Sequence, residues 1–123
     1  MKRIFYSMAL ALCALMLCLP VKATIFNIAT ELEWEYLIVY HQAQDGMLMK
    51  NGDVIRLQHD LNLNYIEGKD HGSVPENWTL TVDLNGHTLR YDGACSATNT
   101  LVECKEGSTL NIKDSGDGGQ WIF

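Results

Sequence analysis

Alternating apolar and polar positions are frequent after residue 52, and they predict β-strands. The clearest run is residues 78–84, in which every second residue is apolar, so a strand here would bury one face and expose the other. Asn85-Gly86 follows directly and is a strong signal for a tight turn. A further strand is predicted at residues 54–57, and the alternation resumes at residues 61–63.

One six-residue motif occurs three times, at residues 52–57, 86–91 and 107–112. Each copy has the order glycine, polar, β-branched, apolar, polar, apolar, and each runs into an aspartate within a few residues. The starting glycines are 34 and 21 positions apart, and the longer gap contains a predicted loop at residues 67–76. Without that loop both spacings would lie in the twenties, which is the length of one coil of a solenoid.

The recurrence predicts that the three copies occupy equivalent places in successive coils of an all-β fold. Residues 109–112 are then expected to match residues 88–91, and residues 100–104 to match residues 80–84. A small antiparallel β-sandwich is the alternative, because alternation and Asn-Gly turns are typical of that fold as well.

One segment departs from the strand pattern and predicts an amphipathic helix at residues 30–44. Thr30 and Glu33 have the spacing of a capping box, and an aspartate–glycine pair ends the segment. The apolar face expected from helical spacing comprises Leu32, Tyr36, Val39, Tyr40 and Ala43, and it is widened by Leu37 and Ile38. Residues 37–40 would also suit a strand, which is the alternative for this segment.

The first 23 residues have the three parts of a secretory signal peptide. Lys2 and Arg3 form a positive start, residues 4–19 are nearly all apolar, and Ala23 is a small residue at a cleavage position. The apolar run is shorter than the roughly 20 residues of a membrane helix, so a retained anchor is the less favoured alternative. We therefore expect cleavage after Ala23, no membrane span in the mature chain, and a secreted, periplasmic or cell-surface location.

Removal of the leader would leave an acidic chain. Six basic residues would then remain against fifteen acidic ones, which gives a formal charge of −9. Nucleic acids and anionic membranes both require a basic face, so neither is expected as a partner.

Cys95 and Cys104 are the two cysteines that remain after cleavage. An even number of cysteines in an exported protein favours a disulfide, which for so short a loop would stabilise the fold by roughly 2–3 kcal/mol. Two free thiols are the alternative, and the spacing does not match a zinc knuckle.

No group of residues predicts a catalytic site, a metal site or a cofactor. Asp114 and Asp117 lie in a glycine-rich turn, but the ligand order of a calcium loop is missing and a plain polar turn is the better interpretation. Asp83 is expected to be exposed and to pair with Arg90 on the next strand. Zinc-ligand spacing is missing among the four histidines, which are His41, His59, His71 and His87.

Aromatic residues suggest two kinds of contact. Trp34, Trp78 and Trp121 carry flat faces of the kind that stack on sugar rings, but large aromatics in a small domain are more often core residues. Trp121, Ile122 and Phe123 would form an uncapped apolar edge on the last coil. We predict that this edge contacts a partner or a second copy of the chain.

The predicted helix is followed by the segments NGDVIRL, LTVDLNGHTLRYDG and GSTLNIKDSGDGG. This order resembles the start of right-handed parallel β-helix proteins of the pectate-lyase-like type, in particular the exported, cell-surface members found in bacteria. The resemblance covers residues 30–123 and implies a short right-handed parallel β-helix whose first coil is capped by the helix. The enzymes of that group use acidic clusters in later coils of longer chains, and no residue here matches such a motif.

These observations predict three parts: a signal peptide at residues 1–23, an N-terminal cap with the helix at residues 24–52, and β-helix coils at residues 53–123 that continue further. We expect a non-catalytic exported module that presents or binds a polysaccharide, a protein partner or a further part of the same solenoid. One alternative is the N-terminal fragment of a polysaccharide lyase or glycoside hydrolase. Another is a standalone secreted binding or inhibitor domain held by the disulfide.

Overall fold

Parallel strands stacked in three sheets make up most of the fold. The computed structural model describes residues 22–94 and 96–123, and every pair of neighbouring strands in its sheets is parallel. The first sheet has the order β1 (Ile25–Ile28), β2 (Val54–Leu57), β5 (Thr79–Asp83) and β8 (Thr109–Lys113). The second has the order β3 (Leu61–Asn64), β6 (Thr88–Asp92) and β9 (Gln120–Ile122), and the third pairs β4 (Ser73–Val74) with β7 (Glu103–Cys104). The fold is therefore a parallel β-helix, and the antiparallel sandwich is excluded.

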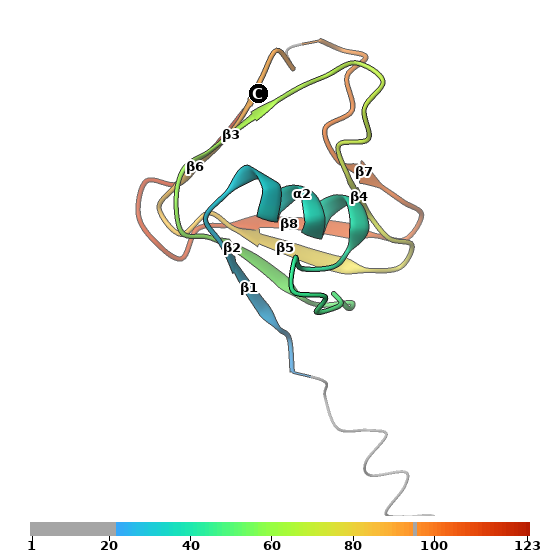
Figure 1. The fold of residues 1–123 in the computed structure, drawn as a ribbon, viewed down its shortest axis with the longest axis vertical. Helices are drawn as coiled ribbons and strands as arrows, with labels where there is room; N and C mark the ends of the chain where they lie inside the picture. The colour runs from blue at the N-terminus through green and yellow to red at the C-terminus, as the bar shows by residue number, and fades with distance from the viewer. Residues whose placement is uncertain (1–21, 95) are drawn as a thin grey trace, which may run out of the picture.

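Each coil passes through the three sheets in turn, so that the sheets form the sides of a triangular prism (Figure 1). One coil contains β2, β3 and β4, the next contains β5, β6 and β7, and β8 and β9 belong to a third. Residue 54 pairs with residue 81 and residue 81 with residue 111, so successive coils are 27 and 30 residues long. Helix α2 (Glu31–Tyr40) lies over the interior of the prism at its N-terminal end (Figure 1).

The predicted equivalence of the three six-residue motifs is wrong for the second copy. Residues 54–57 and 109–112 lie in the first sheet, but residues 88–91 lie in the second. Leu110 therefore pairs with Leu80 of the first sheet, and residues 109–112 do not stack on residues 88–91 as expected.

The mismatch arises from a turn residue that is not glycine. Asn77 precedes the first-sheet strand of the middle coil with a φ of 62°, and Gly107 does the same one coil later with a φ of 71°. Asparagine tolerates this left-handed conformation, so the middle coil keeps the turn without the glycine that marks the other two copies. Gly86, with a φ of 79°, instead turns the chain between β5 and β6.

Residues 67–76, which were expected to form only a loop, contain a strand of the third sheet. This strand, β4, buries Val74 completely and pairs in parallel with β7. Residues 100–104 therefore do not stack on residues 80–84, contrary to the prediction. A two-residue strand has too few positions to show an alternating pattern, so sequence reasoning could not recognise it.

Side chains stack from coil to coil in the interior. One ladder consists of Phe26, Ile55, Val82 and Ile112, on strands about 4.8 Å apart. Ile55 and Val82 have no exposed surface, whereas Ile112 is 44% exposed because no described strand covers the far side of β8. Each coil therefore buries its apolar side chains against its neighbours in the stack.

Helix α2 begins where the capping box predicts. The Thr30 hydroxyl accepts a hydrogen bond from the Glu33 backbone N–H at 3.2 Å, and it donates to the Glu33 carboxylate at 3.0 Å. The helix ends at Tyr40, earlier than predicted, because His41 adopts a left-handed φ of 54° and closes the C-terminus.

The buried face of α2 matches the predicted one only in part. Leu37 and Ile38, which were expected to widen the apolar face, are buried together with Trp34, whereas Leu32 and Tyr40 are 52% and 64% exposed. Apolar residues occur around most of this helix, so helical spacing allows more than one apolar stripe. Packing on the prism decides which stripe is buried.

Trp34 connects the helix to the coils. Its indole N–H donates to the Tyr91 hydroxyl at 3.2 Å, and its ring meets Trp121 edge-on with centroids 6.2 Å apart. Tyr91 and Trp121 are themselves stacked at 6.4 Å. Burial raises the pKa of Tyr91 to about 12, although the hydrogen bond from Trp34 acts in the opposite direction. This aromatic column ties α2 to the second sheet.

Two predictions involve residues outside the described ranges. Residues 1–21 of the predicted signal peptide lie outside them, and so does Cys95. The disulfide between Cys95 and Cys104 therefore stays a prediction. In the described part of the chain, no helix has the length and apolar character needed to cross a membrane.

Ile55 and Ile112 provide a matched test of coil stacking. We expect Ile55→Ala to lower the free energy of unfolding by about 2–5 kcal/mol, because it removes a fully buried side chain between two coils. Ile112→Ala should cost on the order of 1 kcal/mol, since this side chain is already partly in water. Urea unfolding followed by circular dichroism measures both values, and equal losses would contradict the stacking argument.

Candidate functional site

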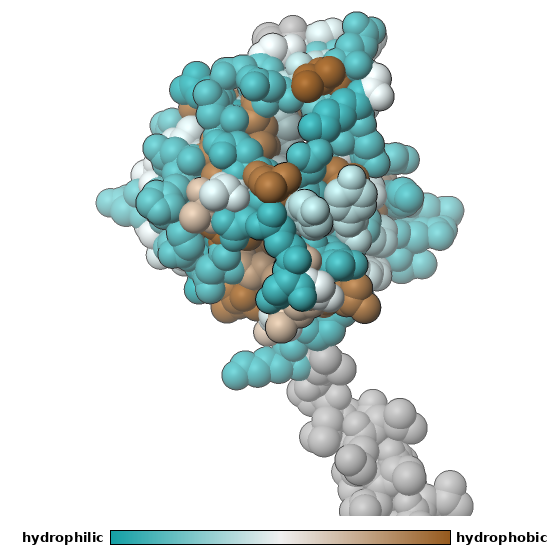
Figure 2. All heavy atoms as spheres, in the orientation of Figure 1, coloured by the Kyte–Doolittle hydropathy of each residue, from teal (hydrophilic) through white to brown (hydrophobic). Residues whose placement is uncertain are grey.

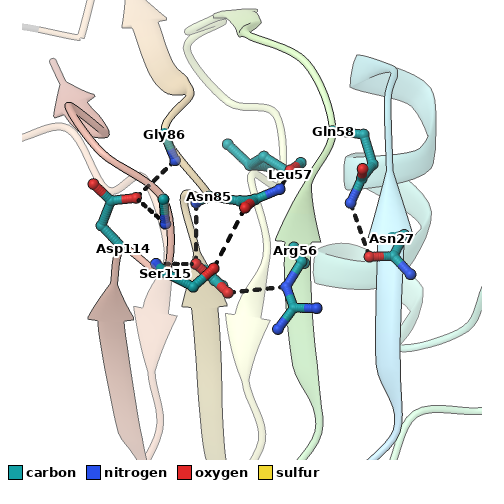
Figure 3. A network of polar contacts seen from close by, with 10 residues as sticks. Asn27, Arg56, Leu57, Gln58, Asn85, Gly86, Asp114 and Ser115 are labelled. Carbon is teal, nitrogen blue, oxygen red and sulfur yellow. Dashed lines mark hydrogen bonds and ion pairs between the residues drawn. The ribbon is translucent and has the colours of Figure 1, made fainter.

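A polar corner joins the first sheet to the second (Figure 3). Gln58 donates a hydrogen bond to the Asn27 side chain at 2.9 Å. Asn85 donates to the Leu57 carbonyl at 3.1 Å and accepts from the Ser115 hydroxyl at 3.4 Å. Each of these bonds joins residues of neighbouring coils, so the polar corner holds the coils in register.

Asp83 lies within the polar corner and has no exposed surface. It accepts hydrogen bonds from Arg56 Nε at 2.9 Å and from the backbone N–H groups of Asn85 and Ser115 at 3.0 and 2.9 Å. Burial by itself raises the pKa of Asp83, but the hydrogen bonds from Ser115, Arg56 and Asn85 outweigh it and lower the pKa to about 2. The predicted exposed pair with Arg90 is wrong, because parallel pairing of β2 with β5 brings Arg56 beside Asp83 instead.

Asp114 closes the same corner one coil later. Its carboxylate accepts hydrogen bonds from the backbone N–H groups of Gly86, Gly119 and Gly116 at 2.7, 2.8 and 3.1 Å, and these bonds lower its pKa. A Cβ on Gly116 would lie 2.5 Å from the Gly86 nitrogen, so this close approach of two turns requires glycine. Both oxygens of Asp114 are engaged by backbone donors, which favours the polar turn over a calcium loop.

A second buried carboxylate ties β1 to the segment before β2. Asp53 has no exposed surface and accepts three hydrogen bonds at 2.8 Å, from the Lys50 ammonium, the Lys50 N–H and the Thr24 N–H. Sequence reasoning missed this group and also missed Arg56. Arg56 could have been recognised as the partner of Asp83 from their separation of 27 residues, which is the length of one coil.

The four histidines do not form a common site. His41 and His71 each contact a backbone carbonyl, at 2.8 and 3.0 Å. His59 and His87 lie side by side with ring centroids 6.4 Å apart. Among residues 22–94 and 96–123, no group of three or more histidine, cysteine or acidic side chains is arranged to hold a metal ion.

The tryptophans lie mainly in packed environments. Trp34 is only 2% exposed, and Trp78 and Trp121 are half-buried. Trp78 packs against His41 with ring centroids 5.8 Å apart. The core interpretation therefore accounts for Trp34, whereas Trp78 and Trp121 keep part of their surface exposed.

A cleft of about 310 Å³ lies between α2 and the segment that follows β3. Glu35 and Lys69, which both line it, form an ion pair at 3.0 Å. Glu31 accepts a hydrogen bond from the Asn62 N–H of β3 at 3.1 Å. Glu31 and Glu35 therefore bind α2 to the first coil. The face of the molecule shown in Figure 2 carries scattered hydrophobic side chains among many polar ones.

The end of the prism away from α2 is uncovered in the described part of the chain. β7, β8 and β9 are the last strands of their sheets, so each has one unpaired edge there. We call these three edges the open coil end, together with the apolar residues Ile112, Trp121, Ile122 and Phe123. Phe123 is 69% exposed, whereas Trp121 and Ile122 of the predicted contact edge are half-buried.

No protein-family model, no curated protein and no solved structure matches this chain. The predicted resemblance is supported at the level of the fold, as stacked parallel sheets, and no family is identified.

Asp83 provides a test of the polar corner. We expect Asp83→Ala to lower the free energy of unfolding by about 2–4 kcal/mol at neutral pH, because Arg56 and two backbone N–H groups lose their acceptor. The folded pKa of about 2 lies below the reference value of 3.8, so the stabilisation is present above about pH 4 and is lost as the pH falls through about 2.

Urea unfolding at a series of pH values measures the difference between the wild type and Asp83→Ala. The difference should shrink between about pH 4 and pH 2. Asp117→Ala is the control, because this aspartate is exposed in the turn beside the corner. A difference for Asp83→Ala that stays constant down to about pH 2 would rule out a stabilising carboxylate at this position.

Proposed function

We propose that this chain is a non-catalytic, exported β-helix module whose open coil end binds a polypeptide partner at the cell surface. The observation that carries this proposal is the difference between the two ends of the prism. At one end, α2 lies over the interior and buries Trp34, Leu37 and Ile38. At the other, the edges of β7, β8 and β9 are unpaired among the described residues.

Unpaired strand edges suit a polypeptide better than a polysaccharide. An edge strand carries backbone N–H and C=O groups at a regular spacing, and an extended peptide can continue the sheet by pairing with them. Leu110 and Ile112 add an apolar strip along β8, because they continue the interior ladders of Leu80 and Val82. The exported location in this proposal rests on the predicted signal peptide.

The proposal predicts that an extended peptide binds at the open coil end. The probe is a fluorescent peptide with the sequence of residues 77–94. This segment contains β5 and β6, the strands that already pair with β8 and β9 within the chain. We expect a saturable rise in fluorescence anisotropy with residues 24–123, and loss of at least tenfold in affinity for Ile112→Lys, because a lysine in the apolar strip would be desolvated without a partner.

Ile25→Lys is the control, because Ile25 is also 44% exposed but lies on the outward side of the opposite edge strand of the first sheet. It should leave peptide binding within about twofold of the wild type.

A parallel incubation with acidic polysaccharides tests the alternative of an enzyme. Release of unsaturated or hydrolysed sugar products by residues 24–123 would overturn the non-catalytic assignment.

A further inference from the structure

We infer that Asn85 is a deamidation site that Asp114 of the next coil keeps unreacted, and that modification of Asn85 opens the polar corner. An asparagine is converted most readily to a carboxylic acid where glycine follows it, because glycine has no Cβ to shield its backbone nitrogen. The chain contains this dipeptide at two turns, Asn51-Gly52 and Asn85-Gly86. The two turns differ in how the neighbouring coil holds them.

Deamidation of Asn85 is an attack by the backbone on the side chain. The Gly86 nitrogen bonds to the Asn85 Cγ, the bond from Cγ to Nδ2 breaks, and ammonia leaves with the proton of the Gly86 N–H. Water then opens the cyclic imide at either carbonyl and gives aspartate or isoaspartate. The first step needs a Gly86 nitrogen that can lose its proton and reach Cγ.

Asp114 holds the attacking nitrogen. Its Oδ1 accepts a hydrogen bond from the Gly86 N–H at 2.7 Å (Figure 3). A hydrogen bond to an ionised acceptor is stronger than a neutral one, so this proton is held more firmly than one bound to a carbonyl group. The backbone N–H groups that lower the pKa of Asp114 also weaken it as a base, so it binds this proton without removing it.

The third coil also covers the Gly86 nitrogen. A Cβ on Gly116 would lie 2.5 Å from this nitrogen, so the turn around Gly116 leaves no room beside it. The Asn85 amide is directed elsewhere, because its Nδ2 donates to the Leu57 carbonyl of the preceding coil at 3.1 Å. The two reacting groups are therefore held by the coils on either side, and the reaction requires a local opening between the second and third coils.

The two asparagines differ in what a carboxylate does to their contacts. Asn85 uses its amide nitrogen as a donor to the Leu57 carbonyl, and an oxygen in that place would face another acceptor. The new charge would also lie next to Asp83, which accepts the Asn85 backbone N–H at 3.0 Å. Asn51 instead uses its side-chain oxygen to accept the Thr79 N–H at 2.7 Å, and a carboxylate keeps this acceptor. Deamidation therefore opens the corner at Asn85 and is tolerated at Asn51.

Peptide mapping by mass spectrometry, after incubation at mildly alkaline pH, measures deamidation at both asparagines in one sample of the protein. We expect Asp114→Ala to raise the rate at Asn85 about tenfold, which corresponds to the loss of one hydrogen bond to a charged group. The rate at Asn51 should stay within about twofold of the wild type, because the Gly52 N–H donates to the Thr79 carbonyl and not to Asp114.

Two further variants separate the charge of Asp114 from its position. Asp117→Ala is the matched control, because this exposed aspartate lies in the same turn, and it should leave both rates unchanged. Asp114→Asn keeps an acceptor without the charge, so its rate at Asn85 should lie between those of the wild type and Asp114→Ala. An unchanged or lower rate at Asn85 in Asp114→Ala would overturn the inference. An equal rise at both asparagines, which marks unfolding of the whole chain, would also overturn it.

Asn85→Asp and Asn51→Asp reproduce the aspartate product at each site and test its effect on the fold. We expect Asn85→Asp to lower the equilibrium constant of folding about tenfold or more, because it removes a donor and leaves the Leu57 carbonyl facing an oxygen. Asn51→Asp should change this constant by no more than about threefold, because its acceptor is kept. Urea unfolding measures both constants, and equal effects would exclude Asn85 as the site at which deamidation opens the corner.

Discussion

The stacking of each coil on the next is the interaction on which the rest of this structure depends. A coil of about 30 residues has no core of its own, so its inward side chains are buried by the coils above and below. Ile55 and Val82, in the middle of one ladder, have no exposed surface, while Ile112 at the end of the same ladder is 44% exposed. The backbone hydrogen bonds follow the same direction, from strand to parallel strand across the coils. Both contributions are missing on the outer side of the first and last described strands of each sheet.

Coils can stack only if their turns lie at the same place in each coil. Buried carboxylates contribute to this alignment of the turns. Asp83 and Asp53 have no exposed surface, yet each is surrounded by N–H donors and a basic side chain from a different part of the stack or turn. A carboxylate that accepts several hydrogen bonds keeps its charge despite burial, as the low pKa of Asp83 reflects. Where the turns at Gly86 and Gly116 approach each other, no side chain fits between them. Carboxylates and glycines thus keep the corners aligned while the apolar ladders supply most of the buried surface.

The two ends of the prism differ in the described part of the chain. α2 buries Trp34 into an aromatic column with Tyr91 and Trp121, so the first coils are covered and held by a hydrogen bond as well as by packing. The open coil end presents strand edges and partly exposed apolar side chains. Exposed edges of this kind are sites at which further polypeptide adds to a sheet. The described part of the chain therefore has one end covered by α2 and one end with unpaired strand edges.

The sequence by itself determined the features that depend on a few neighbouring residues. These are the capping box that starts α2 at Thr30, the Asn-Gly turn before β6 and the alternation of β5. The expectation of stacked coils came from the recurrence of one motif along the chain, and the expectation that they are parallel came from the resemblance. The tertiary structure decided what depends on residues a full coil apart. Asn77 takes the place of a glycine at one turn, so the sequence motif matched strands of different sheets. The position of Arg56 beside Asp83 follows from a register of 27 residues between coils. The buried stripe of α2 was decided in the same way, because a helix with apolar residues on most sides acquires a buried face only when it packs on a particular surface.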